Sequence, residues 1–107
     1  MRMWMTDPRG MCRQHLLGEH VETHMFVGAI LKGTALDGYV AGGLLESKSL
    51  ERRHNALVRE MTRRGMKHQS PLKKFKLPSI CYVDRAAARA ELIRRCEECR
   101  KLPRALE

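Results

Sequence analysis

The chain has 107 residues, enough for one domain but too few for two domains that each bury a core. Its content of 43% hydrophobic and 31% charged residues is typical of a folded soluble protein and argues against a disordered chain. The excess of Lys and Arg gives a net charge of +9, which indicates a partner rich in phosphate, with nucleic acid ahead of an acidic membrane surface. Because the chain has no apolar run of about 18 residues and no signal-peptide core, we expect no membrane partner and a cytoplasmic location.

The first predicted helix covers residues 13 to 32. It follows an irregular lead-in, residues 1 to 12, which contains the turn sequence DPRG. Apolar residues recur at helical spacing along the segment, and Gly33 is a natural stop. The side chains expected to be buried on this helix are Leu17, Val21, Val27, Ile30 and Leu31.

The opposite face of this helix is polar and resembles the lining of a site. His15, Gly18, Glu19 and Glu22 share that face, because an ideal helix drifts only about 20° over seven residues. A glycine between a histidine and a carboxylate leaves space for another group to approach. The alternative interpretation is a solvated polar face.

Further along the chain, residues 33 to 43 are rich in glycine and are expected to form a loop. Ser49 is a candidate N-cap for a second helix over residues 50 to 64, with Gly65 just past its end. The buried stripe of this helix is predicted to be Leu50, Leu57, Val58 and Met61.

The last part of the chain is predicted to be a connector and a third helix. The connector spans residues 66 to 82, where Phe75 stands among lysines and is suited either to stacking on a base or to packing on the core. The third helix begins after Asp84 and ends before Pro103. Its buried stripe is Ala88, Leu92, Cys96 and Cys99. The sequence thus predicts an all-α fold, a single compact domain over residues 1–107 with about three helices and long loops.

The cysteines and histidines leave two interpretations open. Cys96 and Cys99 lie one helical turn apart, and a zinc site there would need two further ligands, for which Cys81 and His68 are candidates. Small buried thiols are the alternative, and we expect no cofactor. His20 and His24, four residues apart, raise a weaker hypothesis of a metal-dependent hydrolase, although they lack the glutamate arrangement of a zincin helix.

The amino terminus itself is a candidate nucleophile. An α-amino group is neutral in roughly a tenth of molecules at pH 7, whereas a lysine is neutral in only a few per ten thousand. The bulky Arg2 predicts that Met1 is retained as the terminal residue, because removal of the initiator methionine generally needs a small second residue.

Two segments carry a resemblance to a known family. The first is the run QHL at residues 14 to 16, followed by Glu19, Glu22 and Gly28-Ala29. The second is RHNALVREMTRRGM at residues 53 to 66, followed by His68 and the tripeptide SPL at residues 70 to 72. In one register over about residues 1 to 75, the chain resembles the pyrimidine-dimer DNA glycosylases, also called the phage endonuclease V family. Together with its opening MRMW, it is most similar to the cellular branch.

The resemblance implies an all-helical fold and two linked activities, excision of a damaged pyrimidine and cleavage of the strand as an abasic-site lyase. It implies that the α-amine of Met1 forms an imine with the sugar C1′ and that Glu22 supports this chemistry and the following β-elimination. It places Arg2, Gln14 and His15 near the DNA and Lys32 on a phosphate.

The chain departs from the phage enzyme at several positions. Val21 and Met25 stand where the phage enzyme has arginines, and the aromatic, basic tail of that enzyme has no counterpart in the final residues RKLPRALE. Despite these differences, the resemblance favours a monomeric DNA repair enzyme acting on double-stranded DNA that contains damaged pyrimidines or abasic sites. A non-catalytic, basic helical DNA-binding module that keeps the family fold is the alternative.

Overall fold

The computed structural model describes residues 1–67, 71–76 and 81–102. Over these residues it contains helices and no strand, so the predicted all-α fold class is confirmed. None of the helices in the described ranges has both the length and the apolar character that crossing a membrane requires. In chain order the helices are η1 (Pro8–Gly10), α1 (Arg13–Lys32), α2 (Asp37–Ala41), η2 (Ser47–Ser49), α3 (Leu50–Arg63), α4 (Arg85–Arg95) and α5 (Glu97–Lys101).

The first helix, α1, has the predicted bounds. It ends where Gly33 takes a left-handed backbone conformation, with φ of 72°. The N–H of Gly33 donates to the last helical carbonyls, those of Ala29 and Ile30. A residue with a Cβ is strained in this conformation, so glycine is the residue best suited to end the helix here.

The predicted buried face of α1 is correct only in part. Val27 is buried, and Leu17 and Ile30 are partly buried against the core, but Val21 and Leu31 are 53% and 51% exposed. The apolar spacing was misleading because the buried stripe of α1 includes polar side chains whose partners lie on other elements. The buried residues are Leu16, Glu19, His20, Thr23, Phe26 and Val27.

The second predicted helix corresponds to α3, which ends one residue earlier than expected. Ser49 precedes it, but its side chain does not cap the helix and its hydroxyl instead donates to Glu46 at 2.5 Å. The short helix η2 leads directly into α3, which changes the local geometry at Ser49. Arg64 is the C-cap residue, and Gly65 follows it with φ of 84°. The predicted stripe is otherwise confirmed, since Leu50, Leu57 and Met61 are buried and Val58 is half-buried.

The glycine-rich segment is not entirely a loop, because α2 forms within it. The helix is short, and Tyr39 packs its ring against Phe26 of α1 with 5.3 Å between the ring centroids. The partner of Tyr39 belongs to another helix, so the glycine content of the segment could not predict this contact.

The third predicted helix is divided into α4 and α5. Asp84 caps α4 by accepting from the N–H of Ala87 at 3.0 Å. The chain becomes extended at Cys96, with φ of −120° and ψ of 111°, and the Cys96 sulfur accepts from the N–H of Cys99. The predicted single helix is therefore wrong at this point, and Pro103 lies outside the described residues.

The connector contains no helix in its described residues, 66–67, 71–76 and 81–82. Phe75 is half-buried and packs against the core, which favours the packing interpretation over a free aromatic ring.

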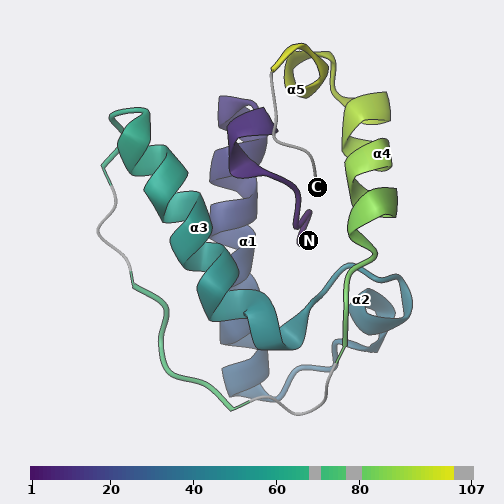
Figure 1. Cartoon of the computed structure of the whole chain (residues 1–107). Coiled ribbons are helices and arrows are strands. Elements are labelled where there is room, and N and C mark those ends of the chain that lie inside the picture. Colours follow the sequence, from purple (N-terminus) through teal and green to yellow (C-terminus); the bar gives the residue numbers. More distant parts are fainter. Residues whose placement is uncertain (68–70, 77–80, 103–107) are drawn as a thin grey trace.

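The helices surround a core to which the lead-in contributes Met3, Trp4 and Met11. The most extensive helix–helix packing is between α1 and α3 (Figure 1). The start of the chain lies between α1 and α4, where the N–H of Met3 donates to the carbonyl of Leu44 at 2.7 Å. This hydrogen bond anchors the first residues to the segment between α2 and η2.

Candidate active site

The polar face of α1 forms one wall of a pocket at the amino terminus. All four residues predicted to share that face line it, together with the first residues of the chain and a residue at the end of α4. The pocket has a volume of about 370 Å³. Its lining residues are Met1, Arg2, Trp4, Gln14, His15, Gly18, Glu19, Glu22 and Arg95.

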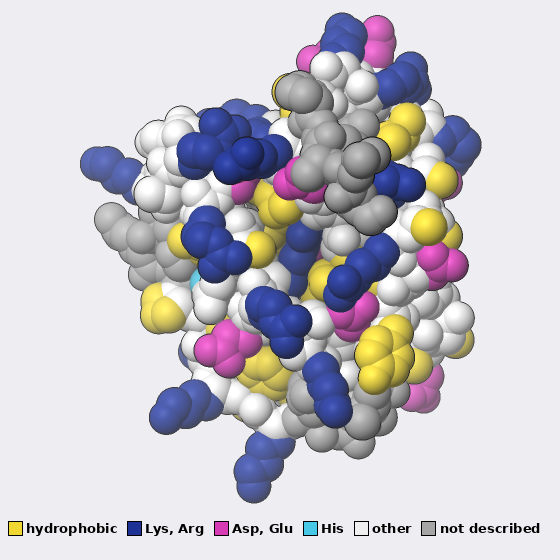
Figure 2. All heavy atoms as spheres, viewed as in Figure 1, with side chains coloured by type: hydrophobic (Ala, Val, Ile, Leu, Met, Phe, Trp, Pro, Cys, Tyr) yellow, Lys and Arg dark blue, Asp and Glu magenta, His cyan; other side chains and the backbone are white. Residues whose placement is uncertain are grey.

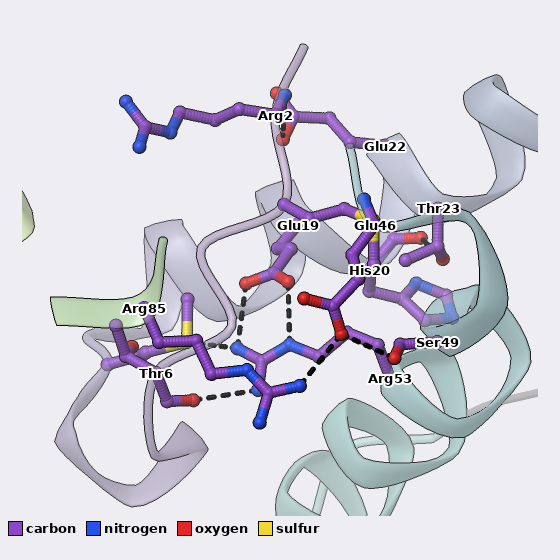
Figure 3. A network of polar contacts seen from close by, with 12 residues as sticks. Arg2, Thr6, Glu19, His20, Glu22, Thr23, Glu46, Ser49, Arg53 and Arg85 are labelled. Carbon is purple, nitrogen blue, oxygen red and sulfur yellow. Dashed lines mark hydrogen bonds and ion pairs between the residues drawn. The ribbon is translucent and has the colours of Figure 1, made fainter. Parts of the chain in front are cut away.

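Glu22 lies beside the amino terminus. Its Oε2 accepts a hydrogen bond from the backbone N–H of Arg2 at 3.3 Å, so the residue bearing the α-amine is the immediate neighbour of this contact (Figure 3). Burial raises the pKa of Glu22, and the Arg2 N–H and the positive charge of the amino terminus oppose that shift. The carboxylate and the terminal amine are therefore close enough to interact electrostatically.

Arg2 and Trp4 form a second wall of the pocket. The guanidinium of Arg2 stacks over the Trp4 ring, 3.8 Å from its centroid, and that of Arg95 lies 5.4 Å from the same centroid. Burial and the positive charge of Arg95 lower the pKa of Arg2. The sequence did not identify Trp4 or Arg95 as site residues, because Arg95 reaches the pocket only through the packing of α4.

His15 and Gln14 lie at the start of α1. The His15 ring meets Trp4 edge to face, with 5.8 Å between the ring centroids. Burial and the charge of Arg95 lower the pKa of His15, which favours a neutral imidazole. Gln14 lines the pocket from an exposed position.

Lys32 is not part of this pocket. It lies at the far end of α1 from Glu22, about 15 Å along the axis at the usual helical rise. There it lines a separate hollow with Lys73 of the connector. The structure therefore separates Lys32 from the other residues that the resemblance implied.

Below the pocket, Glu19 forms a buried ion pair with Arg53 of α3. The guanidinium donates through Nε at 2.6 Å and through a second nitrogen at 2.8 Å, and its third nitrogen donates to the carbonyl of Thr6 at 2.7 Å (Figure 3). The side chains of Glu19 and Arg53 are 0% and 6% exposed. Arg53 thus ties α1, α3 and the lead-in together. The sequence placed Glu19 on the right face but gave no sign of this partner.

The metal-ligating residues do not group as predicted. Cys96 and Cys99 lie near Cys12 and His15, whereas Cys81 donates its N–H to Ser47 in another part of the fold. The other candidate, His68, is outside the described residues. His20 and His24 are joined by His54 of α3, with 5.0 Å between each pair of ring centroids.

Basic side chains are spread over the face of the molecule on which the chain begins (Figure 2). On another side of Arg53, a second pocket of about 530 Å³ is rich in arginine. Its cationic lining residues are Arg52, Arg53, Arg85 and Arg89. Such a surface suits a polyanion.

Of three comparisons with known proteins, one gives a match. Neither the curated proteins nor the solved structures contain a match to the chain. The family model for pyrimidine dimer DNA glycosylase matches residues 1–74, a range that holds the lead-in, α1 and α3. Enzymes of this family are DNA glycosylases, so the family implies DNA as substrate. The chain belongs to the pyrimidine dimer DNA glycosylase family.

Proposed function

We propose that this protein excises damaged pyrimidines from double-stranded DNA and then cleaves the strand as an abasic-site lyase. The observation that carries the proposal is the 3.3 Å hydrogen bond between the Arg2 N–H and Glu22, within a pocket that Met1 also lines. It supports a reaction in which the terminal amine attacks a sugar carbon while the carboxylate of Glu22 lies close by. The proteins of the family are glycosylases, which supports the choice of substrate.

In the proposed reaction the α-amine of Met1 attacks C1′ of the damaged nucleotide. The bond from C1′ to the base breaks and the base leaves with a proton, while the sugar ring opens and an imine forms between C1′ and the nitrogen. Loss of a proton from C2′ then expels the 3′ phosphate by β-elimination. Water finally hydrolyses the imine and releases the amine.

Glu22 has two tasks in this sequence. As a carboxylate it stabilises the positive charge of the imine, and it can relay the proton that leaves C2′. Its burial beside the chain terminus suits both tasks, because electrostatic interactions are stronger away from bulk water.

Cationic and polar residues around the pocket supply the proposed DNA contacts. Arg2, Gln14 and His15 line it, and we expect Lys32, farther along the same helix, to meet a phosphate. A sugar carbon inside a duplex is reached only after the DNA bends or a nucleotide flips, and phosphate contacts offset this cost of a few kcal/mol. We expect a monomer to suffice, acting in the cytoplasm on nucleoid DNA.

Borohydride trapping tests the nucleophile. Reduction during reaction with an abasic duplex should link the protein covalently to the DNA, and digestion should place the sugar remnant on the dipeptide Met1-Arg2. A preparation with an acetylated terminus should give no adduct. Equal trapping by the acetylated protein, or an adduct mapped to a lysine, would show that Met1 is not the nucleophile. Salt-sensitive DNA binding without any adduct would favour the non-catalytic module instead.

A further inference from the structure

A cluster of sulfur and nitrogen ligands lies where the start of α5 meets the start of α1. Four side chains place one ligand atom each within 4.8 Å of all the others. We call this group the thiol-imidazole cluster, and its members are Cys12, His15, Cys96 and Cys99. Three thiols and one imidazole are a ligand set of structural zinc sites.

The spacing of these atoms suits a tetrahedron around one ion. Bond lengths of about 2.3 Å to sulfur and about 2.0 Å to nitrogen give tetrahedral edges of about 3.8 Å between two sulfurs and about 3.5 Å between sulfur and nitrogen. The Cys12 and Cys96 sulfurs are 3.9 Å apart. Nδ1 of His15 is 3.3 Å from the Cys12 sulfur and 3.6 Å from that of Cys99. One ion at the centre would thus be within bonding distance of all four atoms after small adjustments.

Backbone amides point at two of the sulfurs. The N–H of Cys12 donates to the Cys99 sulfur at 3.2 Å, and the N–H of Cys99 donates to the Cys96 sulfur at 3.5 Å. Hydrogen bonds of this kind orient ligands and stabilise thiolates at metal centres. The extended backbone at Cys96, which divides α4 from α5, lets both sulfurs of the CEEC sequence turn to the same point.

We propose that the thiol-imidazole cluster binds one zinc ion. Cys81 is a buried core thiol that, among the described residues, belongs to no such cluster. A disulfide is a poorer account of the geometry, because a bond of about 2.05 Å would join only two of the sulfurs and leave the imidazole unused.

The zinc ion would fasten α5 to the start of α1. Two of its ligands, Cys12 and His15, lie inside the range matched by the family model, and Cys96 and Cys99 lie beyond it. The centre would hold Arg95, the residue before Cys96, at the rim of the amino-terminal pocket. The ion would bind Nδ1 of His15, and this inference does not depend on the proposed lyase chemistry.

Metal analysis of the full chain tests this inference. The protein, purified without chelator from zinc-supplemented cells, should hold one zinc ion per chain by elemental analysis. Modification of its thiols with a mercurial should release that ion. Exchange for Co²⁺ should give tetrahedral d–d bands and a thiolate-to-cobalt charge-transfer band. Cys96→Ser and Cys99→Ser should weaken or abolish zinc retention and this band, whereas Cys81→Ser is the matched control and should keep both.

Three results would overturn the proposal. The first is a wild-type chain that neither retains zinc nor takes up Co²⁺. The second is a cobalt spectrum without thiolate charge transfer. The third is equal metal loss in Cys81→Ser and Cys96→Ser. A cobalt spectrum of the second kind would indicate the three histidines as the metal site. If the cluster variants fail to fold, the mercurial titration of the wild-type chain decides the question by itself.

Discussion

Glu22 is the residue whose chemistry can be tested most directly. Glu22→Gln keeps the size of the side chain and its hydrogen bond to the Arg2 N–H but removes the charge. We expect single-turnover borohydride trapping on abasic DNA to fall by about 10²- to 10⁴-fold, the usual contribution of a general acid or base. Glu51→Gln, on the exposed side of α3, is the control and should trap at the wild-type rate. Unchanged trapping in Glu22→Gln would remove the carboxylate from the mechanism.

The raised pKa of Glu22 also predicts a pH effect. The side chain becomes protonated at a higher pH than an ordinary glutamate, because burial disfavours its charged form. Protonation of an attacking amine already slows trapping as the pH falls. Protonation of Glu22 in the same pH range should make the trapping rate fall more steeply on the acid side. The Glu22→Gln variant should lack this extra steepness. Parallel pH profiles for the two proteins would contradict the assignment.

Gly18 provides a test of the pocket as the place of reaction. A Cβ at Gly18 would meet nothing within 4 Å, and the same holds for Gly28, which lies in α1 but outside this pocket. Leucine at either position should leave the helix stable, since both glycines lie within α1 and leucine is a better helix former. We expect Gly18→Leu to reduce trapping at saturating DNA by at least about tenfold, because its side chain enters space that the sugar needs. Gly28→Leu should react like the wild type, and equal effects of the two changes would argue against this pocket.

At the scale of the elements, the ion pair between Glu19 and Arg53 joins α1 to α3. Removing one member leaves the other charged and buried, which typically costs about 3 to 5 kcal/mol. We therefore expect Glu19→Ala to lower the free energy of unfolding by about that amount in urea denaturation. Glu51→Ala, an exposed control, should change it by less than about 0.5 kcal/mol.

The double variant makes this test specific. Glu19→Met combined with Arg53→Met should cost much less than the sum of the single changes, because neither charge is then left without its counterpart. Additive costs would mean that the two side chains act independently.

The helices show how far the sequence could specify the fold. The C-terminal ends of α1 and α3 are marked by glycines at positions 33 and 65, whose effect is local and therefore visible in the sequence. The break at Cys96 depends on a sulfur that accepts a backbone hydrogen bond, and no proline or glycine marks it. The exposure of Val21 has a long-range cause instead, because the buried side of α1 is decided by partners far away in the chain.

The candidate site shows the same limit. Helical geometry placed His15, Gly18, Glu19 and Glu22 on one wall because their spacing is a property of one segment. The opposite wall required Arg95, which is brought there by packing between segments at the two ends of the chain. Likewise the CEEC sequence was visible as half of a ligand set, but its completion by Cys12 and His15 depended on tertiary structure.

At the scale of the whole molecule, the net charge of +9 predicts strongly salt-dependent DNA binding. The logarithm of the association constant should fall linearly with the logarithm of salt concentration, with a slope of about −0.9 for each phosphate neutralised. If Lys32 meets a phosphate, Lys32→Gln should reduce the magnitude of that slope by about one, as measured by fluorescence anisotropy on an undamaged duplex. Lys32→Arg keeps the charge and should retain the slope. Identical slopes for the glutamine variant and the wild type would exclude this contact.

The contacts of Arg53 should also limit which amino-acid changes homologous proteins accept at this position. Its guanidinium holds the carbonyl of Thr6, and so it supports the segment that carries the first residue, although its own side chain is buried beneath the pocket. Selection that preserves the reaction should therefore constrain this position as strictly as those that meet the nucleotide. Lineages that abandon the arginine should also have replaced the acid at position 19, so paired exchanges at these two sites are expected among distant homologues.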